Sequence, residues 1–216
     1  MASTIEALET LKGVLQNKEA QRGLIKLYSQ SQSECTKDGR CGMEIGMARE
    51  KDQGAVLKLF LGDKINTDVD NSLPEDCNIL GEKVSVKHSC SKVGTPFKAI
   101  WSSADRSVKE AINNIINAED SYYPHLLITY FDLKGKKITI ICIQADFNKK
   151  VIKEMKDDAF KVPKGNSRGI EYSTKAMKEL LQNRYFTIEI ANADLTGGAN
   201  PIDRRIKLLK DMGINP

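Results

Sequence analysis

The sequence predicts an α/β protein with a central mixed β-sheet flanked by helices and a helical addition at the N-terminus. Near-continuous apolar runs at 126–131 and 138–143 are typical of central strands that are covered on both faces. Patterns with helical spacing precede, separate and follow the predicted strands. The first two of these patterns come before any strand, which places helices at the start of the chain.

Composition bounds the class of protein. The 216 residues, with 40% hydrophobic and 29% charged side chains, suit one soluble globular domain. We expect a single domain over 1–216, with a helical accessory or dimer-contact layer (1–30), a core (43–191) and a terminal helix (200–213). The formal charge of +4 permits a polyanionic partner without requiring one. The odd count of five cysteines, none in C-x-x-C spacing, indicates neither a disulfide framework nor a zinc ribbon. With no secretory leader and no long apolar run, we expect a cytoplasmic protein without a membrane partner.

Helices are predicted to open the chain. Ser3 and Glu6 have capping-box spacing, and leucines follow at helical intervals. A second helical pattern follows Asn17, and the polar stretch 29–42 predicts a loop. A third helix is predicted over 43–61, with Gly62 as its C-cap.

Residues 76–88 read as a β-hairpin. Gly81-Glu82 suits a two-residue turn, which sets Asp76 opposite Lys87 and Asn78 opposite Ser85. Side chains alternate between the faces of a strand, so an acid and a lysine share a polar face. The other face collects four apolar or thiol side chains: Cys77, Ile79, Val84 and Val86. On its own, such a pair is an ordinary surface ion pair worth at most about 1 kcal/mol. Held beside a divalent metal, the same pair could orient a water molecule and stabilise charge on a phosphate.

Pro74-Glu75-Asp76, a short turn and then Ser85-Val86-Lys87 resemble the PD-(D/E)XK nuclease signature. The whole chain resembles the small type II restriction endonucleases of the ThaI family. The resemblance implies a restriction-endonuclease-like core, with Asp76 holding Mg²⁺, Lys87 as the catalytic lysine and the Val86 carbonyl as a further metal ligand. Ser85 stands where the family pattern has an acid, so a second acid must come from elsewhere. We favour Glu50, and the alternatives are Glu44, Asp52, Glu75 and Glu82.

The resemblance also implies partners. Such enzymes act on double-stranded DNA as homodimers, because protein symmetry matches a palindromic site. It further implies a short site of G and C only, cut to blunt ends. Met43 and Met47 share a helix face, which is usually a core arrangement. With Arg40 and Arg49 nearby in sequence, they could instead face the minor groove.

Basic residues after the hairpin are further candidates for DNA contact. The predicted loop 89–101 places Lys92 and Lys98 near the phosphates. A helix is predicted over 103–118, capped by Ser103, and 149–158 is only weakly helical. The stretch 161–169 is either a solvated loop or a base-reading loop. Its candidate contacts are Lys161, Lys164, Asn166 and Arg168. A helix over 173–182 and a strand over 186–190 complete the predicted core.

Three functions are compatible with these patterns. The first is a Mg²⁺-dependent type II restriction endonuclease. The second is a repair or junction nuclease of the same core without sequence specificity. The third is a DNA-binding module without catalysis, which Ser85 would favour.

Overall fold

The structure is a computed structural model of the chain. It describes residues 3–37, 42–70, 73–101, 107–162 and 169–195, together with positions 202, 206, 210 and 211. The helices are α1 (Thr4–Gln16), α2 (Lys18–Lys37), α3 (Gly42–Leu61), α4 (Val108–Ile116), α5 (Ala145–Met155) and α6 (Thr174–Gln182). The strands are β1 (Ile65–Asn66), β2 (Cys77–Ile79), β3 (Glu82–Ser89), β4 (Lys98–Trp101), β5 (His125–Asp132), β6 (Lys137–Ile143), β7 (Phe160–Lys161), β8 (Gly169–Tyr172) and β9 (Phe186–Ile190). Short 3-10 turns are η1 (Gly62–Lys64), η2 (Asp120–Tyr122) and η3 (Lys156–Ala159).

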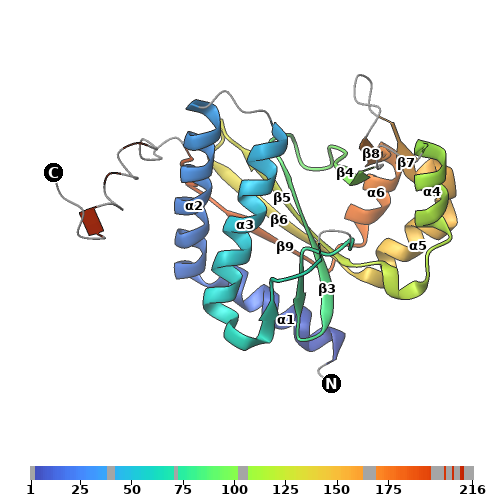
Figure 1. Ribbon diagram of the computed structural model, residues 1–216, viewed down its shortest axis with the longest axis horizontal. Helices are drawn as coiled ribbons and strands as arrows, with labels where there is room; N and C mark the ends of the chain where they lie inside the picture. The colour runs from blue at the N-terminus through green and yellow to red at the C-terminus, as the bar shows by residue number, and fades with distance from the viewer. Residues whose placement is uncertain are drawn as a thin grey trace.

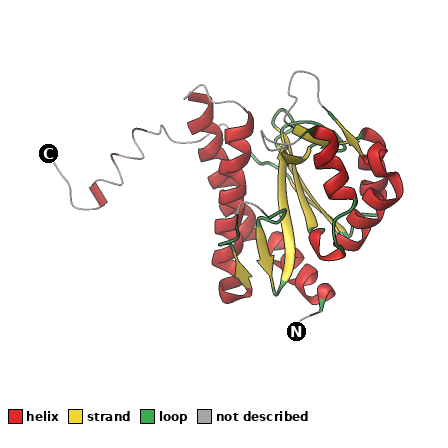
Figure 2. Ribbon diagram, turned by 45° about the vertical axis from the view of Figure 1, so that its right-hand side comes forward, coloured by secondary structure: helices red, strands yellow, loops and turns green. Residues whose placement is uncertain are grey.

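A six-stranded mixed sheet in the order β1-β2-β3-β5-β6-β9 forms the centre of the molecule. The β3–β5 pair is parallel and the other pairs are antiparallel. Helices α2 and α3 lie together on one side of the sheet, and α4, α5 and α6 lie on the other (Figures 1 and 2). The predicted α/β class with a flanked mixed sheet is confirmed.

Each face of the sheet has its own hydrophobic core. Alternate residues of the central strands, such as Leu127 and Ile140, pack with α1, α2 and α3. Their neighbours Leu126 and Ile141 pack with α4, α5, α6 and a second sheet, ordered β4-β8-β7. Both central strands are therefore buried on both faces, as their apolar runs predicted.

Several helices begin or end at the residues that the sequence predicted. Ser3 caps α1 by accepting a hydrogen bond from the Glu6 backbone N–H, and Ser173 caps α6 through Ala176. Gly62 follows α3 with a positive φ of 59°, which suits a glycine at this position.

The prediction of a loop over 29–42 is wrong for residues 29–37, which continue α2. Ser29 and Ser31 are buried, and the Ser31 hydroxyl donates to the Asp52 carboxylate on α3 at 2.5 Å. Contacts between the two helices therefore outweigh the poor helix propensity of these residues.

Three other predictions in the second half also need correction. Residues 98–101 form β4 instead of a loop, because they pair with β8. Helix α4 begins after Ser107, whose side chain forms a capping box with Glu110, so Ser103 is not the cap. Residues 145–155 form the regular helix α5 with Val151 and Ile152 buried, so the weak helical signal at 149–158 understated it.

The predicted terminal helix at 200–213 falls almost wholly outside the described residues. No helix in the described ranges is both long and apolar enough to cross a bilayer.

Candidate active site

The candidate site lies where β2 stops pairing with β3. The two strands pair only over Cys77–Ile79 and Glu82–Val84. Residues 85–89 of β3 continue beside β5 on one edge, but no described strand pairs with them on the other. Asp76 stands immediately before β2, at the start of this open edge.

The Asp76 carboxylate takes the place of a neighbouring strand. Its Oδ2 accepts hydrogen bonds from the Val86 backbone N–H at 2.6 Å, the Ser85 hydroxyl at 3.1 Å and the Lys87 Nζ at 3.2 Å. No donor among the described residues hydrogen-bonds its Oδ1. The carboxylate is thus fixed through one oxygen, and the other oxygen is left for a ligand.

Lys87 and Val86 complete this edge. The Lys87 and Asp76 side chains form an ion pair with about a fifth and a third of their surfaces exposed. In an extended strand, the N–H and C=O of one residue point to the same side. Because the Val86 N–H points at Asp76, its carbonyl also faces the open edge.

The predicted hairpin register is wrong by two residues, which leaves the predicted faces right. Cys77 pairs with Val84 and Ile79 with Glu82, which places Asp76 opposite Ser85 instead of Lys87. The turn is Leu80-Gly81, with positive φ values of 51° and 93°. This combination is typical of a type I′ turn, which usually has Asn, Asp or Gly at its first central position, so Leu80 did not indicate it in the sequence. The slip preserves the side-chain alternation, so Lys87 still reaches Asp76, diagonally.

Glu50, on α3, lies in the same electrostatic environment. The pKa of its carboxyl is raised to about 7, mainly by burial; the positive charge of Lys87 lowers this pKa and the negative charge of Asp76 raises it. An acid held partly buried beside another acid is costly to ionise. A cation between them would remove that cost.

The other acids considered for this role have other partners. Asp52 accepts from Ser31, and the buried Glu75 lies 3.7 Å from the Nζ of Lys83. Glu82 accepts from Thr4 and pairs with His125. The side chain of Glu44 lies outside the described residues.

The residues at the open edge fit a hard divalent cation. Mg²⁺ is bound through one or two carboxylates, with waters and substrate phosphates completing an octahedron. Asp76, Glu50 and the Val86 carbonyl offer oxygen ligands of this kind. The described residues contain no group of three or more His, Cys, Asp or Glu side chains that could hold a metal by themselves. The chemistry of the edge therefore suits Mg²⁺ shared with a phosphate better than a closed protein cage such as a structural zinc site.

Comparison with known proteins assigns the fold and the family. A family model described as "Restriction endonuclease ThaI" matches residues 11–209. The chain belongs to the ThaI restriction endonuclease family. A solved structure described as "Restriction endonuclease in complex with substrate DNA" is similar, with a TM-score of 0.71 and 24% identity, covering 93% of this chain and 99% of that one. That likeness supports the fold, and no curated protein matches the chain.

Membership of the ThaI family confirms the resemblance expected from the sequence and makes the chain a restriction-type nuclease. The matched region includes the hairpin, α3 and both layers of helices, so the candidate site lies well inside it.

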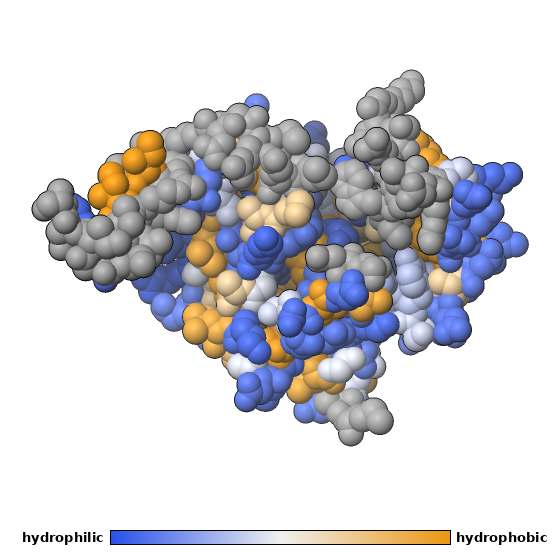
Figure 3. All heavy atoms as spheres, in the orientation of Figure 1, coloured by the Kyte–Doolittle hydropathy of each residue, from blue (hydrophilic) through white to orange (hydrophobic). Residues whose placement is uncertain are grey.

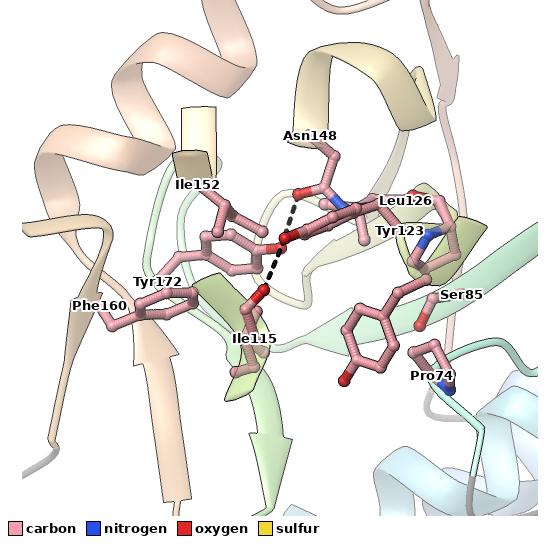
Figure 4. A pocket seen from close by; sticks show the side chains of 12 residues that line it. Pro74, Ser85, Ile115, Tyr123, Leu126, Asn148, Ile152, Phe160 and Tyr172 are labelled. Carbon is pink, nitrogen blue, oxygen red and sulfur yellow. Dashed lines mark hydrogen bonds between the residues drawn. The ribbon is translucent and has the colours of Figure 1, made fainter. Parts of the chain in front are cut away.

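Within the ThaI family fold, the surroundings of Ser85 explain how a serine is accommodated there. Ser85 is buried and lines a cavity of about 30 Å³ beside Tyr122, Tyr123 and Leu126 (Figure 4). A second carboxylate here would be buried against apolar walls and next to Asp76. A hydroxyl instead donates to Asp76 and supports it from the protein side.

The predicted DNA contacts differ widely in their placement. Met47 on α3 and Lys92 after β3 are exposed. Lys98 lies on β4, and Lys161 on β7 pairs with Glu171 at 3.2 Å. Arg40, Lys164, Asn166 and Arg168 lie outside the described residues, as does the side chain of Met43.

Arg49 is placed inside the protein. It is 1% exposed, donates to Cys90 Sγ at 2.9 Å and Gln32 Oε1 at 2.5 Å, and stacks over the Phe131 ring at 3.9 Å. Its guanidinium is occupied by internal contacts, which argues against the predicted contact with DNA.

Sequence reasoning missed a buried polar cluster on the opposite face of β3 from Lys87. It consists of Tyr28, Gln53, His88 and Thr129. Gln53 precedes the buried Val56 and Leu57 by about one turn of α3, so helical spacing places it on the buried side of that helix. A polar residue at such a position was the available signal.

Proposed function

We propose that the chain is a Mg²⁺-dependent type II restriction endonuclease that hydrolyses phosphodiester bonds in duplex DNA at a short palindromic site. The observation that carries this proposal is the Asp76–Lys87 pair, 3.2 Å apart on an open strand edge, with Glu50 in the same electrostatic environment. Family membership supports the nuclease class.

Each residue at the edge has a role in this proposal. Asp76, Glu50 and the Val86 carbonyl would hold the metal, and Ser85 keeps the Asp76 carboxylate oriented. Bound there, Mg²⁺ would supply positive charge to the phosphate and to the leaving oxygen. Lys87 holds the attacking water in place and donates a hydrogen bond towards the charge that develops on the phosphate.

The DNA interface proposed around this site combines α3 with the basic segments after β3. Met47, one turn before Glu50, is 52% exposed, so it is available as an apolar wedge in the minor groove. Lys92, Lys98 and Lys161 would supply phosphate and base contacts. So would five residues whose side chains lie outside the described part of the chain: Arg40, Met43, Lys164, Asn166 and Arg168.

We further propose a homodimer, since a two-fold protein suits a palindromic site. Hydrophobic residues on the face in Figure 3 lie scattered among hydrophilic ones. The ThaI resemblance supports a recognition site made of G and C only, which is cut to blunt ends. We also propose that the protein is cytoplasmic, because reduced cysteines are usual there and Cys35, Cys77, Cys90 and Cys142 are free thiols.

Digestion of plasmid DNA in Mg²⁺, with EDTA as the control, tests the proposal. We expect discrete fragments that all end at the same G/C sequence with blunt ends. A continuous smear would favour a repair or junction nuclease, and binding without cleavage in any divalent metal would favour a DNA-binding module.

A further inference from the structure

We propose that Gln53 is a positioning residue: its side-chain oxygen fastens α3 to β3 and thereby sets the separation between Glu50 and the Asp76–Lys87 pair. The inference rests on the function proposed above and names a residue that does not touch the reacting atoms.

The geometry of the cluster is that of a clamp. Gln53 is fully buried, and its Oε1 accepts from the Tyr28 hydroxyl at 2.9 Å and from the Thr129 hydroxyl at 3.3 Å. The Nε2 of His88 lies 3.1 Å from the same oxygen. One side-chain atom of α3 thus joins three elements: α2, β3 and β5.

His88 adds a third contact to this oxygen. An imidazole whose proton is on Nε2 donates from that nitrogen, which lies within hydrogen-bond distance of Gln53 Oε1.

Only a few residues along α3 and β3 separate the clamp from the candidate site. Gln53 is three residues after Glu50, so the two lie about one turn apart on α3. His88 directly follows Lys87, so the two side chains point to opposite faces of β3. A shift of α3 along β3 would therefore move the metal-binding acid relative to the lysine.

The clamp is not the arrangement that would favour stability most. The surrounding layer is apolar, with Val56, Leu57 and Leu24 buried nearby. Within the described residues, Gln53 Nε2 and His88 Nδ1 have no hydrogen-bond partner. A wholly apolar layer in place of this polar cluster would avoid those unpaired groups but would pack without fixing direction. Directional bonds to one oxygen hold the register of helix against strand, which apolar packing alone does not.

Gln53→Met tests the inference, because methionine has a similar length and lacks the acceptor. Gln21→Met is the matched control: Gln21 is also a buried glutamine, and it donates to the Leu15 carbonyl on α1 at 2.9 Å instead of contacting β3. Each variant is assayed for metal-free binding to duplex DNA, for single-turnover cleavage in Mg²⁺, and for amide hydrogen exchange over residues 46–54.

In Gln53→Met, we expect roughly 10–100-fold slower cleavage, faster exchange in α3 and less than about threefold change in DNA binding, as for other groups that orient a metal ligand. Gln21→Met should leave all three unchanged. Unaltered cleavage in Gln53→Met, or losses of binding and cleavage in equal proportion, would overturn the inference.

Two further outcomes keep the test decisive. If Gln53→Met does not fold, Tyr28→Phe removes one donor and no carbon atoms, and unchanged cleavage in that variant overturns the clamp. If the native protein does not cleave DNA at all, the proposed function fails while the exchange experiment still tests the clamp, because unchanged exchange in α3 would refute it separately.

Discussion

Lys87 and His88 are neighbours on one strand and have opposite environments. Lys87 is partly exposed and lies in an ion pair at an open edge. His88 faces the helical layer, where it contacts Gln53 and stacks on Phe131 with 5.8 Å between ring centroids. The difference teaches that β3 separates two tasks by side-chain alternation. One face carries the charged pair proposed for the chemistry, and the other carries the buried polar groups proposed to hold α3 in place.

The largest expected effect is on catalysis. Lys87→Ala should lower single-turnover cleavage about 10²–10⁴-fold, because the water and the phosphate lose their ammonium partner. The free energy of unfolding should change by less than about 1 kcal/mol, since the lost pair is partly exposed. Lys137→Ala, which removes another strand lysine paired with Glu189, is the control for cleavage. Cleavage that survives Lys87→Ala intact would remove Lys87 from the site.

The neighbouring substitution should reverse this pattern. His88→Ala should destabilise the fold by about 2–4 kcal/mol, because it leaves a cavity beside Phe131 and frees one bond to Gln53. Urea denaturation measures this loss. If Lys87→Ala proved the more destabilising of the two, the division between the faces of β3 would be incorrect.

We expect the ionised Glu50 carboxylate to lower the stability of the metal-free protein. Its raised pKa means that the folded state binds more protons than the unfolded state between pH 4.5 and about 7. Stability is therefore lost as the pH rises through this window, and the full penalty remains above it. Glu50→Gln should stabilise the metal-free protein by about 1–3 kcal/mol above pH 7 and by nothing below pH 4.5. Thermal unfolding in EDTA at the two pH values measures the difference, and an equal effect at both would contradict the position of Glu50.

The smallest effect is expected at the surface of α3. Met47→Ala should weaken DNA binding by about three- to tenfold, because an exposed apolar wedge is lost, and should leave folding unchanged. Leu59, also on α3 and 80% exposed, provides the control variant Leu59→Ala. Equal DNA binding by both variants and the native protein would exclude Met47 from the interface.

The sequence predicted features that repeat and missed features that depend on remote partners. Alternation along 76–88 assigned the correct face to Asp76, Ser85 and Lys87, and the apolar runs located β5 and β6. The register failed because nothing local marks Leu80 for a positive φ.

Tertiary contacts account for the other misses. Ser29 and Ser31 look like loop residues until α3 packs on them, and Arg49 looks like a surface cation until Phe131 and Gln32 surround it. Glu50 was the favoured second acid, but only the folded chain separates it from Asp52, Glu75 and Glu82, by the partners that each of those has found.

The bond from the Val86 N–H to Asp76 also bears on solubility. An exposed strand with unpaired amides is a template on which a second molecule can add its own strand, and charge at such an edge discourages this. Because Asp76 pairs with one of these amides and places a charge at the edge, it also disfavours the addition of a strand from a second molecule. Asp76→Ala would leave the Val86 N–H without its partner, so self-association of the purified variant would reflect the unpaired edge of β3 and not a general failure to fold.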